Sequence, residues 1–319
     1  MCASGAAVSW AEGGSAPLYV KNLGPVAGLL GLPSQRAANS QAVGSYSLAL
    51  HSSIANHFVT EVQAPEQVHL DGETLRFALE LRYGLAEHWD IQLEVPWLEH
   101  SGGRLDSVIE SWHDLWGMSD GGRSSVNHDI LAMRYLAPEV YFSFTDDATG
   151  LGDISVALNY AFYRDHNSAA SAVVGYKFAT GDEDELLGSG ADDVFFALRF
   201  SGAHLADLPL SWHGQVGYLH AGNSEVLGSR QEENLWFAGL ALDWAVADNV
   251  SLFAQLDMHA APLDSDLTVF GSDAFLGALG ARWSLGRHWS LDLSFIEDLQ
   301  VETAPDITFQ ASIRYTGSR

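Results

Sequence analysis

Apolar and polar residues alternate along most of the chain. Between positions 75 and 85 the odd positions hold leucine, phenylalanine or tyrosine, and arginine and glutamate stand among the even ones. After a break at 86–88 the alternation resumes, with Trp89, Ile91, Leu93, Val95 and Trp97 on one parity. Successive side chains of a β-strand point to opposite faces, so a period of two predicts strands and the short break predicts a hairpin.

The same pattern recurs and predicts twelve strands. They cover residues 43–58, 74–85, 89–98, 152–163, 171–179, 193–201, 210–220, 234–244, 250–259, 274–285, 289–296 and 307–315. Most have the length of about 9 to 11 residues that a tilted strand needs to cross a bilayer, whereas strands of globular sheets commonly have about 5 to 6.

The connections between these strands alternate in length. Short connections are predicted at 86–88, 164–170, 202–209, 245–249 and 286–288, and long polar ones at 59–73, 99–150, 180–192, 221–233, 260–273 and 297–306. Short turns on one side, long loops on the other and an even strand number are typical of a transmembrane antiparallel β-barrel of the bacterial outer membrane. We therefore predict an all-β fold with a barrel at 42–319, whose long extracellular loop spans 99–150.

The apolar parity is predicted to face lipid and the polar parity to face the lumen. The lumen of a barrel grows only about linearly with strand number, so it has no room for so many large apolar side chains. Trp89, Trp97, Trp236 and Trp244 bracket two strands, as interfacial girdles do. The predicted lumen-lining charged residues are Arg76, Glu80, Arg82, Glu94, Asp153, Lys177, Arg199, Asp257, Arg282, Asp292 and Arg314.

Composition excludes other classes of protein. The net charge is −26, with only 15 lysines and arginines, which argues against a nucleic-acid partner. No stretch approaches the roughly 18 consecutive apolar residues of a spanning helix.

The amino-terminal segment is predicted to lie outside the barrel wall. Residues 1–11 have the small apolar residues of a signal-peptide remnant, which indicates export. Residues 12–41 form a periplasmic arm, and the part at 17–38 contains three prolines and no alternation. The arm either folds into the lumen as a plug or remains a loosely ordered tail.

The long loop carries a pattern of its own. Apolar residues at helical spacing predict a short amphipathic helix, which either covers the barrel mouth as a lid or dips into the outer leaflet. A further strand is predicted at 139–144, in an extracellular hairpin. The lid-helix residues are Leu105, Val108, Ile109, Trp112, Leu115 and Trp116.

Three groups of residues are candidates for a catalytic or metal-binding site. His51 and Ser53 share a strand face, but that face is the polar one, so lumen lining is favoured over lipid hydrolysis. Dispersed His213, Asp257 and His259 lack a compact ligand spacing and favour hydrogen-bonded lumen residues over a metal site.

An acidic loop at 182–193 is a weak candidate metal site. Its candidate ligands are Asp182, Asp184 and Asp192, but their spacing does not fit an EF-hand, so we favour a solvated acidic loop, bridged through divalent ions to lipopolysaccharide phosphates. No cofactor motif occurs, and none is predicted.

Two sets of motifs resemble known families. "GLGD" at 150–153 with "TGD" at 180–182 resembles the phenol meta-degradation outer-membrane family, although Ala179 replaces the usual proline. "KNLGP" at 21–25, "GLPSQ" at 31–35 and "DSVIESWHDLWGM" at 106–118 more closely resemble the Gram-negative family called domain of unknown function 3187. This second resemblance spans nearly the whole chain and implies an outer-membrane barrel without known site residues.

Three functions follow from these observations. The first is a passive outer-membrane channel for small solutes, including small hydrophobic or aromatic compounds, in which opposed lumen charges set selectivity. The second is a closed barrel with a structural or surface-interaction role, and the third is a lipid-modifying enzyme. We favour the non-enzymatic functions, with outer-membrane lipid, lipopolysaccharide and a small solute as partners.

Overall fold

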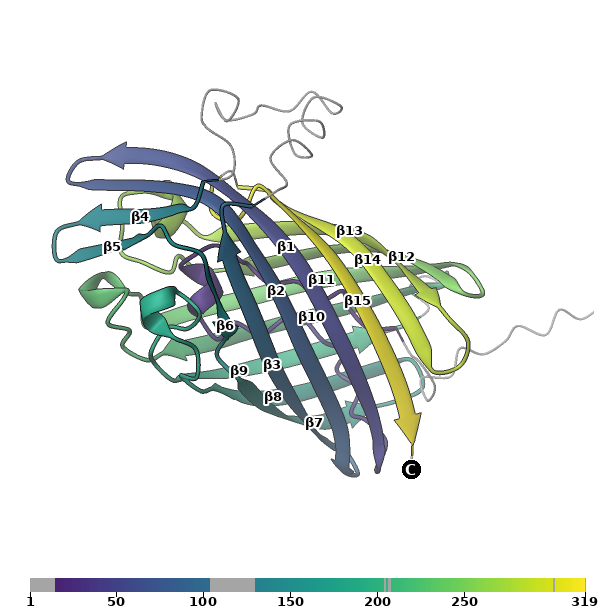
Figure 1. Cartoon of the computed structure of the whole chain (residues 1–319). Helices are drawn as coiled ribbons and strands as arrows, with labels where there is room; N and C mark the ends of the chain where they lie inside the picture. Colours follow the sequence, from purple (N-terminus) through teal and green to yellow (C-terminus); the bar gives the residue numbers. More distant parts are fainter. Residues whose placement is uncertain (1–14, 104–129, 204, 206–207, 301, 319) are drawn as a thin grey trace, which may run out of the picture.

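Twelve antiparallel strands close into a barrel (Figure 1) in the computed structural model, which describes residues 15–103, 130–203, 205, 208–300 and 302–318. The ring closes where β1 pairs with β15, from Ser45 opposite Ser318 to Asn56 opposite Ile307. The wall consists of β1 (Ser45–Gln63), β2 (Glu66–Ala86), β3 (Trp89–Ser101), β7 (Ser155–Arg164), β8 (Ser168–Lys177), β9 (Asp193–Gly202), β10 (Leu210–Ala221), β11 (Asn234–Ala247), β12 (Val250–His259), β13 (Ala274–Ser284), β14 (Trp289–Asp298) and β15 (Ile307–Ser318).

The described residues outside the wall form three more strands and short helical turns. β4 (Ala132–Ala137) and β5 (Val140–Phe144) make a hairpin that extends β2, and β6 (Ala148–Leu151) pairs with β3. The helical turns are η1 (Ala27–Leu29), η3 (Glu183–Glu185), η5 (Gly228–Arg230) and α2 (Thr268–Gly271). Each described helix is short, and none has the apolar length that crossing a membrane requires.

The twelve predicted wall strands are confirmed, and one predicted connection is wrong. Residues 59–73 are not a long polar loop, because β1 and β2 continue through them as a protruding hairpin. Along β2 the inward parity is apolar at Val68 and Leu70 and polar from Thr74 onward. Because the inward parity changes from apolar to polar along β2, a constant alternation of polar and apolar residues does not reveal the part of the strand before Thr74. The strand predicted at 139–144 is β5, and it lies in a hairpin.

The barrel has its apolar side chains outside and its polar side chains inside. Leu79 is 48% exposed, whereas its neighbour Glu80 on the opposite face is 2% exposed. Trp89, Trp97 and Trp244 are also exposed. An outer surface of leucine, phenylalanine and tryptophan suits hydrocarbon and its interfaces rather than water.

A cluster of buried apolar side chains, which we call the apolar cap, lies at the long-loop end of the barrel. We use this name for the buried side chains that the protruding hairpins and loops contribute, chiefly Val59, Leu70, Met133, Tyr135, Phe142, Leu227, Leu267 and Phe270. The rings of Tyr135 and Phe270 meet edge to face with centroids 5.1 Å apart. Two aromatic rings in this arrangement stabilise a core beyond the burial of their area.

Glu66, at the tip of β2, holds the cap together. Its carboxylate accepts hydrogen bonds from the Tyr135 hydroxyl at 2.8 Å, the Ser265 hydroxyl at 2.5 Å and the Arg230 guanidinium at 2.7 Å. Burial raises the pKa of Glu66, but the hydrogen bonds from Ser265, Tyr135 and the backbone of Asp266, together with the charge of Arg230, outweigh it and bring the pKa below its usual value. Burial is the main reason that the pKa of Tyr135 rises to about 12.

Replacing Glu66 should loosen the cap without opening the barrel wall. In Glu66→Gln the ion pair with Arg230 is lost, and we expect a cost of about 1 to 2 kcal/mol in local opening. Hydrogen exchange of the β4 and β5 amides, followed by mass spectrometry, should become roughly tenfold faster. Glu87→Gln, in an exposed turn, is the matched control and should leave this exchange unchanged. Equal exchange rates in the two variants would contradict the role of Glu66.

Acid should have the same effect on the unmodified protein. A carboxyl whose pKa is lowered on folding stabilises the fold above its unfolded pKa of about 4.3, and this contribution is lost as the pH falls through the folded value. We therefore expect exchange of β4 and β5 to accelerate below about pH 4.3. After correction for intrinsic exchange rates, Glu66→Gln should show a smaller acceleration than the parent protein.

Candidate functional site

The amino-terminal segment lies inside the lumen (Figure 1). From here on, the arm means residues 15–44, which are the described residues before β1 begins at Ser45. The arm enters at the short-turn end, where the Ser15 hydroxyl lies 2.8 Å from His213 Nε2. It turns near the long-loop end, where Gly31 N donates to Asp193 Oδ2 at 2.7 Å. It then returns to the short-turn end, where Gln41 N donates to Asp90 Oδ2 at 3.1 Å. The arm thus runs up the lumen and back down before β1 begins.

The sequence of the arm prevents it from joining the wall as a strand. Pro17, Pro25 and Pro33 lack the backbone N–H that a sheet ladder needs, and they recur every eight residues. The arm is nevertheless buried, with Leu18, Tyr19 and Arg36 almost inaccessible. Its polar groups are therefore satisfied mainly by side chains that project inward from the wall.

An ion-pair cluster joins the middle of the arm to β2 and β3. Arg36 Nε donates to Glu80 Oε2 at 2.9 Å, and Arg76 donates to Glu94 Oε1 at 2.8 Å. The Tyr19 hydroxyl donates to Glu94 at 3.1 Å and accepts a hydrogen bond from Arg76. Removal of one partner from such a buried pair leaves an uncompensated charge and typically costs about 3 to 5 kcal/mol. The arm and the wall therefore depend on each other for the pairing of these buried charges.

The remaining predicted lumen charges pair between neighbouring strands rather than across the lumen. Arg82 meets Asp90 at 3.1 Å, Arg282 meets Asp292 at 2.6 Å, and Lys177 meets Asp153 at 2.8 Å. The other predicted residues differ: Asp257 accepts a hydrogen bond from Gln35 of the arm, and no described hydrogen bond or ion pair involves Arg199 or Arg314.

Sequence reasoning missed the arm's own contribution to the site. Tyr19, Lys21, Gln35 and Arg36 lie in a segment without periodicity, so no pattern assigns them to the lumen. The sequence could have assigned Asp90 and Asp193 to the lumen, because both lie on the inward parity of predicted strands. Charged residues on the polar parity of a predicted strand can therefore be assigned to the lumen from the sequence, whereas the arm has no pattern that would assign its residues there.

The "GLGD" and "TGD" motifs meet in space. Asp153 Oδ1 accepts hydrogen bonds from the backbone of Thr180 at 3.0 Å and Gly181 at 2.9 Å. The Thr180 hydroxyl donates to the Gly152 carbonyl at 2.8 Å, and Asp153 also pairs with Lys177. The two motifs therefore fasten the loop between β8 and β9 to the start of β7, which is a structural role in this chain.

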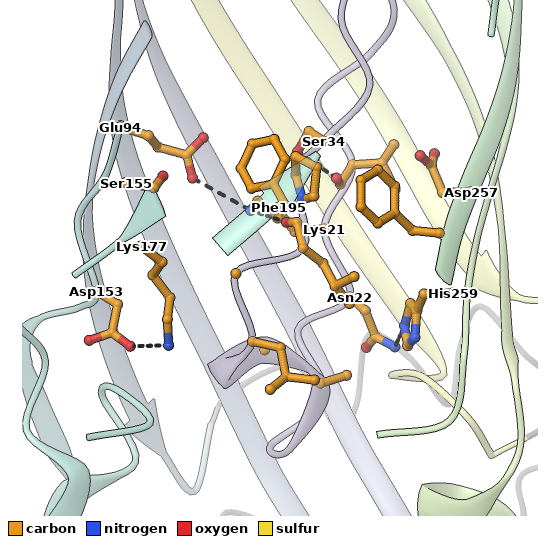
Figure 2. A pocket seen from close by; sticks show the side chains of 18 of the residues that line it. Lys21, Asn22, Ser34, Glu94, Asp153, Ser155, Lys177, Phe195, Asp257 and His259 are labelled. Atoms are coloured by element: carbon orange, nitrogen blue, oxygen red, sulfur yellow. Dashed lines mark hydrogen bonds and ion pairs between the residues drawn. The ribbon is translucent and has the colours of Figure 1, made fainter. Parts of the chain in front are cut away.

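A cavity remains between the arm and the wall (Figure 2). Its volume is about 90 Å³. Figure 2 shows Lys21 directed toward Glu94, with 3.8 Å between Nζ and Oε1, and Asn22 directed toward His259, 3.0 Å from Nε2. Apolar side chains line it as well, among them Phe195. The cavity thus offers both charged and apolar surface to a small molecule.

The two candidate catalytic residues, His51 and Ser53, both point into the lumen, but they form hydrogen bonds with different residues. His51 Nδ1 lies 2.7 Å from the Ser312 hydroxyl, and its ring stacks on Tyr19 with centroids 3.9 Å apart. Ser53 donates to Gln310. This arrangement matches hydrogen-bonded lumen lining, with neither side chain facing the lipid.

The candidate metal ligands are engaged separately. Asp182 accepts from the backbone of Asp184 at 3.0 Å, while Asp192 accepts from the Tyr176 hydroxyl at 2.5 Å. These contacts to Asp192, together with one from Ala179, hold its pKa below the usual range. Within the part of the chain that the structure describes, no three acidic, histidine or cysteine side chains gather as a metal site would require.

Two predicted features lie outside the described residues. They are the signal-peptide remnant at 1–11 and the lid-helix residues between Leu105 and Trp116.

Comparison with solved structures finds outer-membrane barrels that resemble this chain. The crystal structure of the COG4313 outer membrane channel from Pseudomonas putida F1 is 13% identical, with a TM-score of 0.59 over 88% of this chain and 98% of that one. NanC porin is 8% identical, with a TM-score of 0.47 over 85% and 99%. The toluene transporter TodX of P. putida is 11% identical, with a TM-score of 0.40 over 86% and 90%. The first of these shows that the chain has the fold of an outer-membrane channel.

Sequence comparison places the chain in a family. No curated protein matches it in sequence. A family model described as "Protein of unknown function (DUF3187)" matches residues 3–316 of the 319. The chain therefore belongs to the DUF3187 family.

Proposed function

We propose that the protein is an outer-membrane channel for small solutes whose lumen the arm closes as a removable plug. In this proposal the short-turn end faces the periplasm and the long-loop end faces the outside, as is usual for such barrels. The observation that carries the proposal is the polar character of the contact between the arm and the wall. Tyr19, Gln35 and Arg36 all bond to inward wall side chains.

A polar contact suits a segment that leaves and returns. Water can replace hydrogen bonds and ion pairs in an open lumen, so their net contribution to keeping the arm in place is modest. A permanently closed barrel has no need of so many inward charges, because apolar filler is at least as stabilising as buried ion pairs.

The path of the arm also favours withdrawal. Its two ends lie at the short-turn end, near Ser15 and Gln41, and only its turn near Gly31 reaches the long-loop end. The arm can therefore slide out toward the periplasm as a loop, with β1 fixed in the wall. The charges of β2 and β3 would then face the aqueous pore and influence which solutes enter.

A second function is favoured by the apolar cap. Leu29 and Leu30 of the arm belong to the same buried apolar cluster as cap residues such as Phe270. A cap that stays closed without the arm would make the protein a closed barrel with a structural or surface-interaction role. Conductance separates the two functions.

Removing the arm should create a conducting pore. We expect discrete, ohmic steps in planar bilayers when residues 17–38 are replaced by a Gly-Ser linker of equal length, because the linker cannot make the contacts of Arg36 and Tyr19. The parent protein should be silent or open rarely. If the linker variant is folded and heat-modifiable but passes no current, the arm is not the plug, and the closed barrel is favoured.

A cross-link provides the matched control for the plug. A Cβ atom at Gly31 would lie 3.1 Å from Cβ of Asp193, so a disulfide, with Cβ atoms about 3.5 to 4.5 Å apart, forms once the two backbones separate by a few tenths of an ångström. The variant Gly31→Cys/Asp193→Cys, built with Cys2→Ser, should show no openings when oxidised. Reduction of the same sample should restore whatever openings occur before cross-linking.

The charges of β2 should set the ion selectivity of the open pore. In the arm-deleted channel we expect Arg76→Ala/Arg82→Ala to shift the reversal potential toward cation preference, because Glu80 and Glu94 then dominate the lumen. Arg164→Ala, at the exposed end of β7, removes a charge outside the lumen and is the control. An identical reversal potential in the two variants would exclude these arginines from the conducting path.

A further inference from the structure

Arg199 is a buried cation that forms no hydrogen bond or ion pair with any described residue. It lies in the middle of β9, faces the cavity between arm and wall, and is only 2% exposed. No hydrogen bond or ion pair among the described residues involves Arg199, and its Nε has no acceptor. An unpaired buried guanidinium is costly, so such a group usually has a function or a missing ligand.

The charges around Arg199 do not neutralise it. Two carboxylates act on it electrostatically, Asp90 and Glu80, and so do the cations Arg36 and Arg82. Each carboxylate is already bonded to one of these cations, Asp90 to Arg82 and Glu80 to Arg36. The wall therefore supplies paired charges around Arg199 and leaves Arg199 itself available.

The neighbours of Arg199 on the adjacent strands also have unused hydrogen-bonding capacity. Ser171 of β8 and Gln215 of β10 lie directly opposite Arg199 in the sheet register. The Ser171 hydroxyl and Gln215 Oε1 are buried, and neither has a hydrogen-bond partner among the residues that the structure describes. Three adjacent residues with unsatisfied polar atoms are unusual in a folded protein, where nearly all such atoms are bonded.

Apolar side chains adjoin this polar row. Phe195, four residues before Arg199 on the same face of β9, lines the same cavity together with Phe237 of β11. The two rings meet edge to face, with centroids 6.3 Å apart. A ligand at Arg199 therefore meets an anion-binding group on one side and aromatic surface on the other.

We infer that Arg199, Ser171 and Gln215 form a binding site for the carboxylate of a small organic acid with an apolar body. The planar guanidinium donates to both oxygens of a carboxylate, a geometry that lysine does not offer. The Ser171 hydroxyl donates a further hydrogen bond, and Gln215 accepts one from a hydroxyl of the ligand. Phe195 and Phe237 contact the apolar body.

This inference deepens the proposed function, since the acid would be a solute of the same lumen. The site is present while the arm occupies the lumen, because arm residues such as Lys21 and Pro33 line the same cavity. Binding therefore does not require the arm to leave, and it can be measured without conductance.

The test is calorimetric titration of the full chain, folded in detergent, with sodium benzoate. Benzyl alcohol serves as the neutral probe of similar shape, and inorganic phosphate as an anion without an apolar body. We expect benzoate to bind at least about tenfold more tightly than either, as charged hydrogen bonds and ring contacts together provide.

Variants locate the binding. Arg199→Gln should weaken benzoate binding about tenfold or more, and Arg199→Lys should weaken it less because the charge remains. Arg287→Gln removes a cation at an exposed turn and should bind like the parent protein. Heat modifiability verifies that each variant is folded.

The outcomes distinguish this inference from the proposed function. Equal benzoate affinity in Arg199→Gln and Arg287→Gln would overturn the site, as would phosphate binding as tight as benzoate binding. Benzoate binding that depends on Arg199, together with a silent arm-deleted variant, would support the site and reject the channel.

Discussion

The structure depends on one constraint, which is that a barrel with an apolar outer surface must place its polar alternate residues inside. Strand geometry leaves no choice, because a side chain that does not point to the outside points to the lumen. Glu80, Glu94 and Asp90 are thereby buried together with Arg76 and Arg82. The lumen must then provide partners for these charges, since a buried ion without a counter-charge is costly.

The arm meets part of this requirement. Arg36 adds a cation beside Glu80, and the Tyr19 hydroxyl lies between Arg76 and Glu94. The wall accommodates the arm in turn. Gly239 has no side chain where Gln35 passes, and a Cβ there would lie 2.3 Å from Gln35 Nε2. Wall and arm are therefore complementary in both charge and shape, as expected of a segment that belongs in the lumen.

The sequence alone predicts the wall well, because each strand repeats one simple rule of alternation. It fails at the hairpin of β1 and β2, where the inward face changes from polar at Thr74 to apolar at Leu70 as the strand leaves the barrel and covers the cap. It also does not predict which lumen charges are paired. Arg82 and Arg199 both lie at lumen-facing positions of their strands, yet Arg82 pairs with Asp90, whereas no described residue bonds to Arg199. The arm's route leaves no periodic signal, since its prolines exclude it from any ladder.

The up-and-down course of the arm has a topological consequence for biogenesis. Because the arm enters and leaves by the same mouth, closing the seam between β1 and β15 neither traps it nor threads it through a ring. The barrel can be completed around an empty lumen, and the arm can be added afterwards as the final layer of folding. Insertion into the membrane and filling of the lumen are therefore separable events, and a force that unfolds the arm from the short-turn side leaves every wall hydrogen bond intact.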